Sequence, residues 1–222
     1  MLLQQYTKPG GPIRRNVQAI EKIQNVAERE FAANGYEGTP LRKIASGAKV
    51  NQALINYYFG SKEELYLAIF LRRGSELTKE RIRLLDALER RPTRPTVEEL
   101  IRSFLVPAIT MRDRVSDGQD FLRLLARLQS EPQKIAKKIR ETVFDGATFR
   151  FIDAFKSALP QIDQSTIVWR VTMMIGSYLY IVADASRLEQ LSDGMCDGAD
   201  VDEIVRQLSA FLAGGFGARM TV

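Results

Sequence analysis

Apolar residues recur at helical spacing from near one end of this 222-residue chain to the other. No convincing alternation of apolar and polar residues, the pattern of a half-buried strand, accompanies them. In the segment 14–33, for example, Ile20, Ile23, Ala27 and Phe31 mark one face of a helix. The periodicity therefore predicts an all-α fold.

Turn and cap residues divide the first quarter of the chain into short helices. Asn34-Gly35 ends the first helix, because both residue types tolerate the left-handed conformation that follows many helices. Each later helix has a capping residue at its start. These caps are Thr39 before Pro40, Asn51 for a helix that ends near Phe59, and Ser61 with Glu64 three residues further on.

Longer helices are expected in the rest of the chain. Thr96 is the predicted cap of a helix over 97–112 that Pro107 bends. Gly118 lies in a turn before a helix over 121–129. The remaining helices are predicted over 132–158, 163–189 and 201–216, and the segment 163–189 is the most apolar.

The positive charge of the chain is concentrated at its N-terminal end. Residues 1–62 hold nine Lys and Arg against four Glu, a surplus of +5 that equals the net charge of the whole chain. The remaining residues carry no net charge. The charge distribution therefore favours a polyanionic partner at the N-terminal end over nonspecific binding by the whole surface.

The rare residue types exclude several kinds of site. The chain has no histidine, which excludes a His-based metal site and a Ser-His-Asp triad, and we expect no catalytic residue, metal or cofactor. Its single cysteine, Cys196, cannot form an internal disulfide, which indicates a reducing compartment. The start lacks the apolar run of a secretory signal, and the longest apolar run, 171–183, is shorter than the roughly 20 residues of a membrane span. We therefore expect a cytoplasmic protein without a membrane partner.

The segment 50–62, VNQALINYYFGSK, is typical of a helix that enters a DNA groove. Its apolar residues can pack on the preceding helices, which leaves Gln52, Ala53, Asn56 and Tyr57 on the exposed face. Gln52 and Asn56 lie four residues apart, hence on one face, and amides pair with adenine in the major groove. The alternative is the solvated surface of an ordinary three-helix unit, and the localised charge favours DNA.

The motifs over about residues 14–70 resemble the N-terminal domain of TetR/AcrR-type transcriptional regulators. The matching blocks are Phe31 with Gly35-Tyr36, Thr39 with Ile44-Ala45, Val50-Asn51, Ile55-Asn56-Tyr57-Tyr58-Phe59 and Ser61-Lys62-Glu63-Glu64-Leu65. Within that family the chain resembles the branch with an INYHF-type recognition helix. The resemblance implies an all-helical homodimer, usually a repressor, whose C-terminal domain binds a small molecule that releases DNA.

The resemblance also implies which residues contact double-stranded DNA. Carried over by position, the contacts fall on Arg42, Gln52, Ala53, Leu54, Asn56, Tyr57, Tyr58 and Lys62. The chain departs from the family pattern at two places. Lys49 stands in the turn where the family usually has glycine, and a lysine with positive φ costs on the order of 1 kcal/mol there. Tyr58 replaces a common histidine.

These expectations divide the chain into an arm and two domains. The parts are a flexible arm at 1–13, a helix-turn-helix DNA-binding domain at 14–62, a joining helix at about 62–74, and a ligand-binding and dimerisation domain at 75–222. Lys8 on the arm, with Arg14 and Arg15, reaches the DNA backbone or the minor groove in one interpretation. In the other interpretation these side chains are simply solvated.

The segment 163–189 carries apolar residues around nearly its whole circumference. Such a helix must be covered on several sides, which one chain of this size can barely do. We therefore expect a homodimer through the helices near 163–189 and 201–216, which form a four-helix bundle across a two-fold axis. This arrangement places the two recognition helices about one DNA turn, roughly 34–36 Å, apart.

An effector pocket is expected among the middle helices. The candidate lining residues are Phe104, Met111, Phe121, Leu125, Phe144, Phe149, Trp169, Met173 and Tyr178. Taken one at a time, each is better explained as ordinary core; as a group they admit an apolar or aromatic effector. Arg170 is a candidate for an anionic group of the effector, although a surface or intersubunit salt bridge is favoured.

The leading hypothesis is a sequence-specific DNA-binding regulator that leaves a palindromic operator when a small, largely apolar effector binds. Repression is the expected mode. Two alternatives remain open. One is a helical small-molecule-binding protein with weak or lost DNA binding, which Lys49 and Tyr58 keep in play. The other, less favoured, is a helical enzyme, since the chain shows no Gly-rich phosphate loop and no paired carboxylates in an apolar segment.

Overall fold

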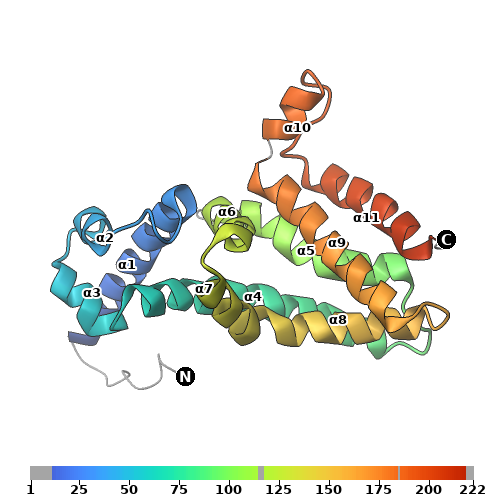
Figure 1. Cartoon of the computed structure of the whole chain (residues 1–222), viewed down its shortest axis with the longest axis horizontal. Coiled ribbons are helices and arrows are strands. Elements are labelled where there is room, and N and C mark those ends of the chain that lie inside the picture. The colour runs from blue at the N-terminus through green and yellow to red at the C-terminus, as the bar shows by residue number, and fades with distance from the viewer. Residues whose placement is uncertain (1–11, 115–117, 185, 219–222) are drawn as a thin grey trace.

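A computed structural model describes residues 12–114, 118–184 and 186–218, and these residues form helices and turns without a strand (Figure 1). The helices are α1 (Pro12–Asn34), α2 (Leu41–Ala48), α3 (Gln52–Phe59), α4 (Lys62–Glu89), α5 (Val97–Arg114), α6 (Gly118–Arg127), α7 (Gln133–Ile139), α8 (Asp145–Ala158), α9 (Gln164–Ala183), α10 (Ser186–Leu191) and α11 (Val201–Gly217). A 3₁₀ turn (Leu128–Ser130) follows α6, and a π-helical segment (Arg140–Phe144) joins α7 to α8. The all-α prediction is confirmed.

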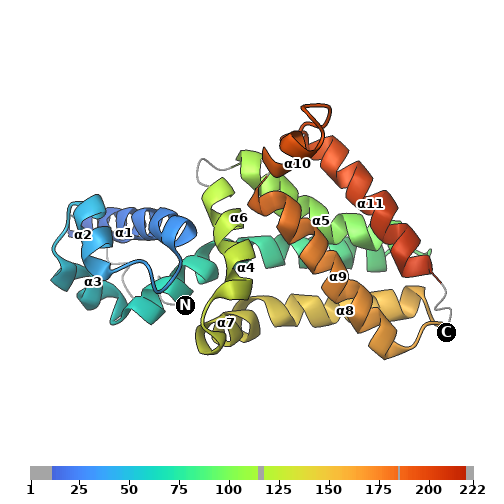
Figure 2. The same cartoon turned by 45° about the horizontal axis from the view of Figure 1, so that its top comes forward.

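Helices α1, α2 and α3 form a small unit at one end of the molecule (Figures 1 and 2). Its core contains Ile23 and Phe31 of α1, Ile44 of α2 and Ile55 of α3, all fully buried. Helix α4 begins in this unit and runs without a break into the larger helical body. The two parts also meet where α1 packs against α6. A single continuous helix and one lateral contact therefore fix the orientation of the small unit.

The predicted caps are confirmed at Asn51 and Ser61 and wrong at Thr39. The Asn51 side chain accepts from the Ala53 N–H at 2.9 Å, and the Ser61 hydroxyl accepts from the Glu64 N–H at 3.1 Å. Thr39 lies one residue too early, because Pro40 is the residue that precedes α2. The buried Thr39 hydroxyl instead donates to the carbonyls of Gly35 and Glu30, and so ties the turn back to α1.

Two predicted boundaries in the larger body are wrong. Helix α6 begins at Gly118, where a turn was expected, and a Cβ there would lie 2.1 Å from the Met111 carbonyl oxygen. The most apolar helix ends at Ala183 instead of residue 189, because the Asp184 side chain accepts from the Ser186 N–H and starts α10. Both corrections come from contacts and caps that helical periodicity does not record.

Helix α9 is the most apolar helix, and one side of it is buried against α6, α8 and α11. By length and composition alone, its 20 residues are enough to cross a membrane. The shorter apolar run 171–183, on which the prediction from the sequence rests, is by itself too short for a span. Only 39% of that helix is buried within the chain. An apolar helix packed on one side is also what a helical core and a subunit interface require.

Candidate DNA-binding surface and its connection to the helical body

Helices α2 and α3 are joined by a tight turn with Lys49 at its centre. Lys49 has φ 54° and ψ 45°, the left-handed conformation, and its N–H is hydrogen-bonded back to the Ser46 carbonyl. The following residue, Val50, is partly buried against the core, with its N–H bonded to the Ala45 carbonyl. The turn therefore keeps the geometry of a helix-turn-helix even though lysine replaces glycine, and the strain that the sequence predicts is present.

The face of α3 that points away from the core carries the predicted base-reading residues. Gln52, Ala53 and Asn56 are exposed, Leu54 is half-buried, and the Tyr57 side chain is 78% exposed. Arg42 of α2 is exposed as well. Exposed amides and a tyrosine on a short helix present hydrogen-bonding groups at the positions that a major groove can receive.

Tyr58 and Lys62 are engaged within the chain. The Tyr58 hydroxyl donates to the Asn16 side-chain oxygen of α1 at 2.9 Å, so its proton is not free for a phosphate. The Lys62 ammonium lies over the Tyr36 ring, 4.5 Å from its centroid. Both predicted phosphate contacts would have to compete with these internal partners. The sequence carried no signal for either partner.

The structure describes only some of the basic residues near the N-terminus. Lys8 and the arm at 1–11 lie outside the described residues, whereas the last two residues assigned to the arm, Pro12 and Ile13, already belong to α1. Arg14 and Arg15 lie in the first turns of α1. Their proposed approach to DNA remains a prediction.

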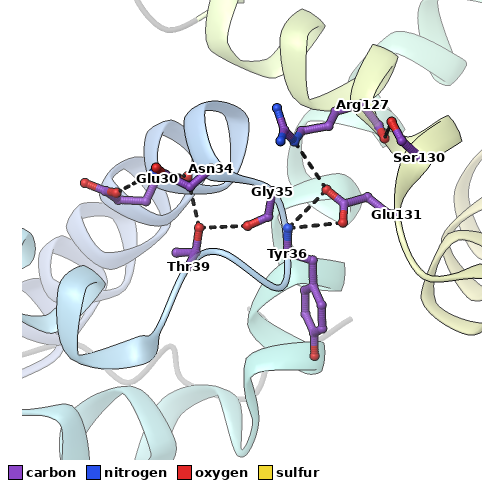
Figure 3. A network of polar contacts seen from close by, with 8 residues as sticks. All are labelled: Glu30, Asn34, Gly35, Tyr36, Thr39, Arg127, Ser130 and Glu131. Carbon is purple, nitrogen blue, oxygen red and sulfur yellow. Dashed lines mark hydrogen bonds and ion pairs between the residues drawn. The ribbon is translucent and has the colours of Figure 1, made fainter.

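A carboxylate from the larger body holds the turn between α1 and α2 (Figure 3). Both oxygens of Glu131, which follows α6, accept from the Tyr36 backbone N–H at 3.0 and 3.1 Å. Arg127 of α6 lies 3.7 Å from the same carboxylate and packs over Gly35. Gly35 has φ 75°, a conformation that favours glycine, and a Cβ there would lie 2.9 Å from the Arg127 Nε, so the arginine side chain would have to shift. We call this group, Gly35, Tyr36, Arg127 and Glu131, the interdomain latch.

A second polar contact joins the start of α4 to α7. The Lys138 ammonium donates to Glu63 at 2.9 Å and to Glu64 at 2.7 Å. This hydrogen bond from Lys138 lowers the pKa of Glu63. Together with the interdomain latch it attaches the small N-terminal unit to α6 and α7 on two sides. Sequence reasoning missed both contacts, because they join residues more than seventy positions apart.

A buried cluster fixes α1 against α4. Glu28 is fully buried and accepts from the Arg72 guanidinium at 2.7 Å, with Arg73 at 3.5 Å. Burial raises the pKa of Glu28, and the two arginines only partly offset that effect. Arg72 also donates to Asn25 at 2.8 Å. The small N-terminal unit is thus anchored to α4 through ion pairs between α1 and α4.

The predicted pocket residues separate into two groups. Phe104, Met111, Phe121, Leu125 and Tyr178 are buried in the larger body, and Phe144 is half-buried beside Gly74. Phe149, Trp169 and Met173 are instead on the surface, each at least 60% exposed. Their side chains point outward and line no interior cavity among the described residues, so their expected place beside the buried pocket residues is corrected.

Arg170 is neither on the surface nor free for a ligand. Its side chain is 92% buried, and its guanidinium donates to the carbonyls of Phe216 and Ala218 at the end of α11. A cation at the C-terminus of a helix satisfies carbonyls that have no partner within the helix. The predicted surface salt bridge of Arg170 is therefore wrong, and the intersubunit salt bridge stays a prediction.

Two hollows open on the larger body. One, of about 450 Å³, lies between α6 and α9 and is lined by residues such as Ala126, Ile175 and Tyr180. The other, of about 480 Å³, lies between α4 and the π-helical segment with α8, and includes Thr78, Ile82, Val143 and Ala147. Both hollows are open to solvent at the surface of the larger body.

An apolar face on α9 and α11 remains uncovered. Trp169, Met173 and Tyr180 of α9 follow one another at helical spacing and are 66%, 60% and 67% exposed. On α11, which packs beside α9, Phe211 is 73% exposed. Gly176 on α9 is also exposed and has open space around it. These residues, which we call the α9/α11 face, lie away from α2 and α3 (Figures 1 and 2).

Two family models match this chain. The model described as "Bacterial regulatory proteins, tetR family" matches residues 23–69, which contain the helix-turn-helix. The model described as "Tetracyclin repressor-like, C-terminal domain" matches residues 102–215, slightly more than half of the chain.

Individual known proteins are also similar to this chain, one in sequence and two in structure. The HTH-type transcriptional repressor NicS of Pseudomonas putida is 37% identical over 49 residues, a segment that spans 22% of this chain and 23% of that relative. A transcriptional regulator FadR from Bacillus subtilis, solved in complex with stearoyl-CoA, has a TM-score of 0.63 at 16% identity, over 88% of this chain and 98% of FadR. PfmR from Thermus thermophilus has a TM-score of 0.62 at 16% identity, over 90% and 96%. At these identities the two structures support the fold alone.

Proposed function

Because this chain belongs to the tetR family of bacterial transcriptional regulators, we propose that it is a homodimeric repressor. In this proposal the dimer binds a palindromic operator, and a small, largely apolar effector releases it. The single observation that carries DNA binding is the exposed row of Gln52, Asn56 and Tyr57 on a helix that follows a helix-turn-helix turn. The local charge surplus of +5 at the N-terminal end supports the same partner.

Operator reading is assigned to α3 and positioning to its neighbours. Gln52 and Asn56 pair with bases, while Ala53 and Leu54 contact thymine methyl groups. Arg42, Tyr57, Tyr58 and Lys62 contact phosphates, which set the position of the helix. For Tyr58 and Lys62 this requires exchange of the Asn16 and Tyr36 contacts for phosphate oxygens. The recognition helix INYYF is assigned to the INYHF-type branch of the family.

The α9/α11 face is proposed as the dimer interface. Four large apolar side chains exposed on two neighbouring helices favour a second copy, because monomers seldom leave such a patch in water. Two copies of α9 and α11 make a four-helix bundle around a two-fold axis. This symmetry calls for a palindromic operator, and we place the protein in the cytoplasm with DNA.

Effector release is proposed to act through the interdomain latch. Helix α6 packs on α5 and α9 in the larger body, and Arg127 at its end, with Glu131 just after it, holds the α1–α2 turn. An effector that moves α6 therefore moves the DNA-facing unit of each subunit. The spacing of the two recognition helices then no longer matches the half-sites.

The test is selection of bound sequences from random double-stranded DNA with the purified full-length protein. We expect a palindrome whose half-sites are centred about one helical turn, roughly 34–36 Å, apart. Gln52→Ala and Asn56→Ala should each weaken binding to the selected site by about 1–3 kcal/mol. Gln133→Ala is the matched control, since Gln133 is also exposed and Gln133, like Gln52, begins a helix.

Two outcomes would reject the proposal. Failure to enrich any sequence at low salt would remove DNA recognition and leave a helical small-molecule-binding protein. An enriched site whose affinity is unchanged by Gln52→Ala and Asn56→Ala would remove α3 as the reading helix.

A further inference from the structure

We propose that Arg81, in the interior of the larger body, binds the carboxylate of an effector whose remaining part is apolar. This inference rests on the proposed function, because it assigns the chemistry of the effector. Arg81 lies in α4 and is 97% buried. It was not among the residues that the sequence indicated.

The guanidinium of Arg81 is only partly satisfied. Its Nε donates to the Phe104 carbonyl at 2.8 Å. Its Nη2 is buried and makes no hydrogen bond within the described part of the chain. The ion pairs between described residues likewise include no carboxylate partner for Arg81. Among the residues that the structure describes, Arg81 is therefore a buried cation without an anion.

The partly buried Arg72 and Arg73 and the buried Arg170 have the partners that Arg81 lacks. Arg72 and Arg73 share the carboxylate of Glu28. Arg170 donates to two carbonyls at the end of α11. Burying an unpaired charge is costly, and each such group in a native structure calls for an explanation. A ligand that brings its own negative charge supplies one.

Aromatic rings surround the guanidinium. Its central carbon lies 3.7 Å from the centroid of the Phe104 ring and 5.4 Å from that of Tyr178. The Phe151 ring packs edge-on against Phe104 at 5.0 Å. These contacts stabilise a cation without neutralising it. The two rings next to Arg81 come from α5 and α9, and Phe151 of α8 packs behind Phe104.

A surface hollow opens between α4 and α8, at the helical turns next to Arg81 and Phe151. The hollow of about 480 Å³ is lined by Thr78, one helical turn before Arg81, and by Ala147, one turn before Phe151. Val143 of the π-helical segment also lines it. Single π-helical turns within α-helices frequently mark functional sites. The hollow is also lined by the charged residues Lys79, Arg83, Asp86 and Arg90, so the proposed effector enters along Ile82, Val143 and Ala147.

The chemical class follows from the fork of the guanidinium. Arginine pairs with a carboxylate through two parallel hydrogen bonds, and Nη2 offers the free donors. The aromatic wall selects an apolar body. The effector is therefore an alkyl or aryl carboxylic acid, and the corresponding neutral amide or alcohol should be a poor substitute.

The experiment measures binding of matched acids and amides by the full-length protein. The probes are hexanoate, octanoate, decanoate, benzoate, phenylacetate and cinnamate, each beside its primary amide, read by the shift in Tm and by calorimetric titration. At least one acid should bind the wild type about 100-fold more tightly than its amide. In Arg81→Met the acid should lose that advantage.

Three variants separate loss of acid binding from loss of folding. Methionine in place of an unpaired buried arginine is expected to fold at least as well as the wild type. Arg81→Lys retains the charge without the fork and should show an intermediate loss. Arg123→Met is the control, since Arg123 on α6 is exposed, and it should leave the preference for the acid unchanged.

Two results would overturn the inference. One is that none of the six acids raises the Tm of the wild type. The other is that Arg81→Met keeps the preference for acid over amide. Operator binding is measured in parallel without a probe. If the protein binds the operator but does not respond to any acid, this inference alone is rejected. Absence of operator binding rejects the proposed function, while binding of the acids can still be measured.

Discussion

Lys49 shows how one residue stores strain in the turn before α3. Its φ of 54° brings the side-chain Cβ close to the following carbonyl, which glycine avoids. Lys49→Gly should therefore raise the free energy of unfolding by about 0.5–1 kcal/mol, measured by urea denaturation.

The matched control is Lys49→Ala, which removes the charge and keeps the Cβ. It should give little of the gain, so equal stabilisation by both variants would show that charge, and not backbone strain, is what matters at this turn. The Lys49→Gly protein should also lose some salt-dependent affinity for DNA if the ammonium contacts a phosphate.

Glu99 provides a residue with a defined pH range. Its carboxylate accepts from Arg91 and from the Thr96 N–H, and these contacts lower its pKa to about 2. Because the pKa is lower in the folded state, Glu99 stabilises the fold above its unfolded value near 4.5. That contribution is lost as the pH falls from 4.5 through about 2.

The measurement compares Tm of the wild type and Glu99→Gln across pH. The difference should be constant between neutral pH and about pH 5 and should shrink toward zero at about pH 2. A difference that stays the same at all pH values would mean that the carboxylate charge contributes nothing to this cap.

At the scale of elements, the interdomain latch depends on a carboxylate that is almost fully buried. The Glu131 side chain is 6% exposed and both of its oxygens accept from the Tyr36 N–H. Glu131→Ala leaves that N–H without its partner, which typically costs about 1–3 kcal/mol when the group is buried. We expect faster hydrogen exchange at the Tyr36 amide and a looser α1–α2 turn, with the helices themselves retained.

Glu131→Gln tests whether the charge is needed. Its amide oxygen can still accept from the Tyr36 N–H, so exchange at Tyr36 should stay close to that of the wild type. Unchanged exchange in Glu131→Ala would show that the α1–α2 turn does not depend on the interdomain latch.

The helices that could be predicted from the sequence are those with local signals. Asn51, Ser61 and Gly35 mark boundaries by their own chemistry, and the structure has these boundaries. The latch could not be predicted, because Glu131 and Tyr36 are 95 residues apart and neither belongs to a motif that pairs them. Trp169 and Met173 were misplaced because a helix that is apolar on all sides does not reveal which side faces its own core.

At the scale of the whole molecule, the α9/α11 face determines the expected oligomeric state. Met173→Glu and Phe211→Glu each place a charge on this face and should convert a dimer into monomers, measured by sedimentation velocity. Phe149→Glu is the control, because Phe149 is 61% exposed on α8, outside that face. Trp169, the single tryptophan, should report the same change through a red shift of its emission on dissociation.

A wild type that is monomeric at micromolar concentration would contradict the interface. Dissociation by Phe149→Glu together with an unaffected Met173→Glu dimer would place the interface on α8 instead. DNA affinity should fall with the dimer, since each half-site then binds alone.

Helix α4 is continuous, so a rotation about a point inside the larger body displaces its first residues. Arg81 stands 19 residues along this helix from its first residue, Lys62, which corresponds to about 28 Å. A tilt of about 5° around Arg81 would displace the start of the helix by about 2–3 Å, and two subunits tilting in opposite senses would double that change. Successive base pairs are about 3.4 Å apart. A rotation of α4 that leaves the packing around Arg81 intact would therefore change the distance between the two recognition helices by more than one base-pair step.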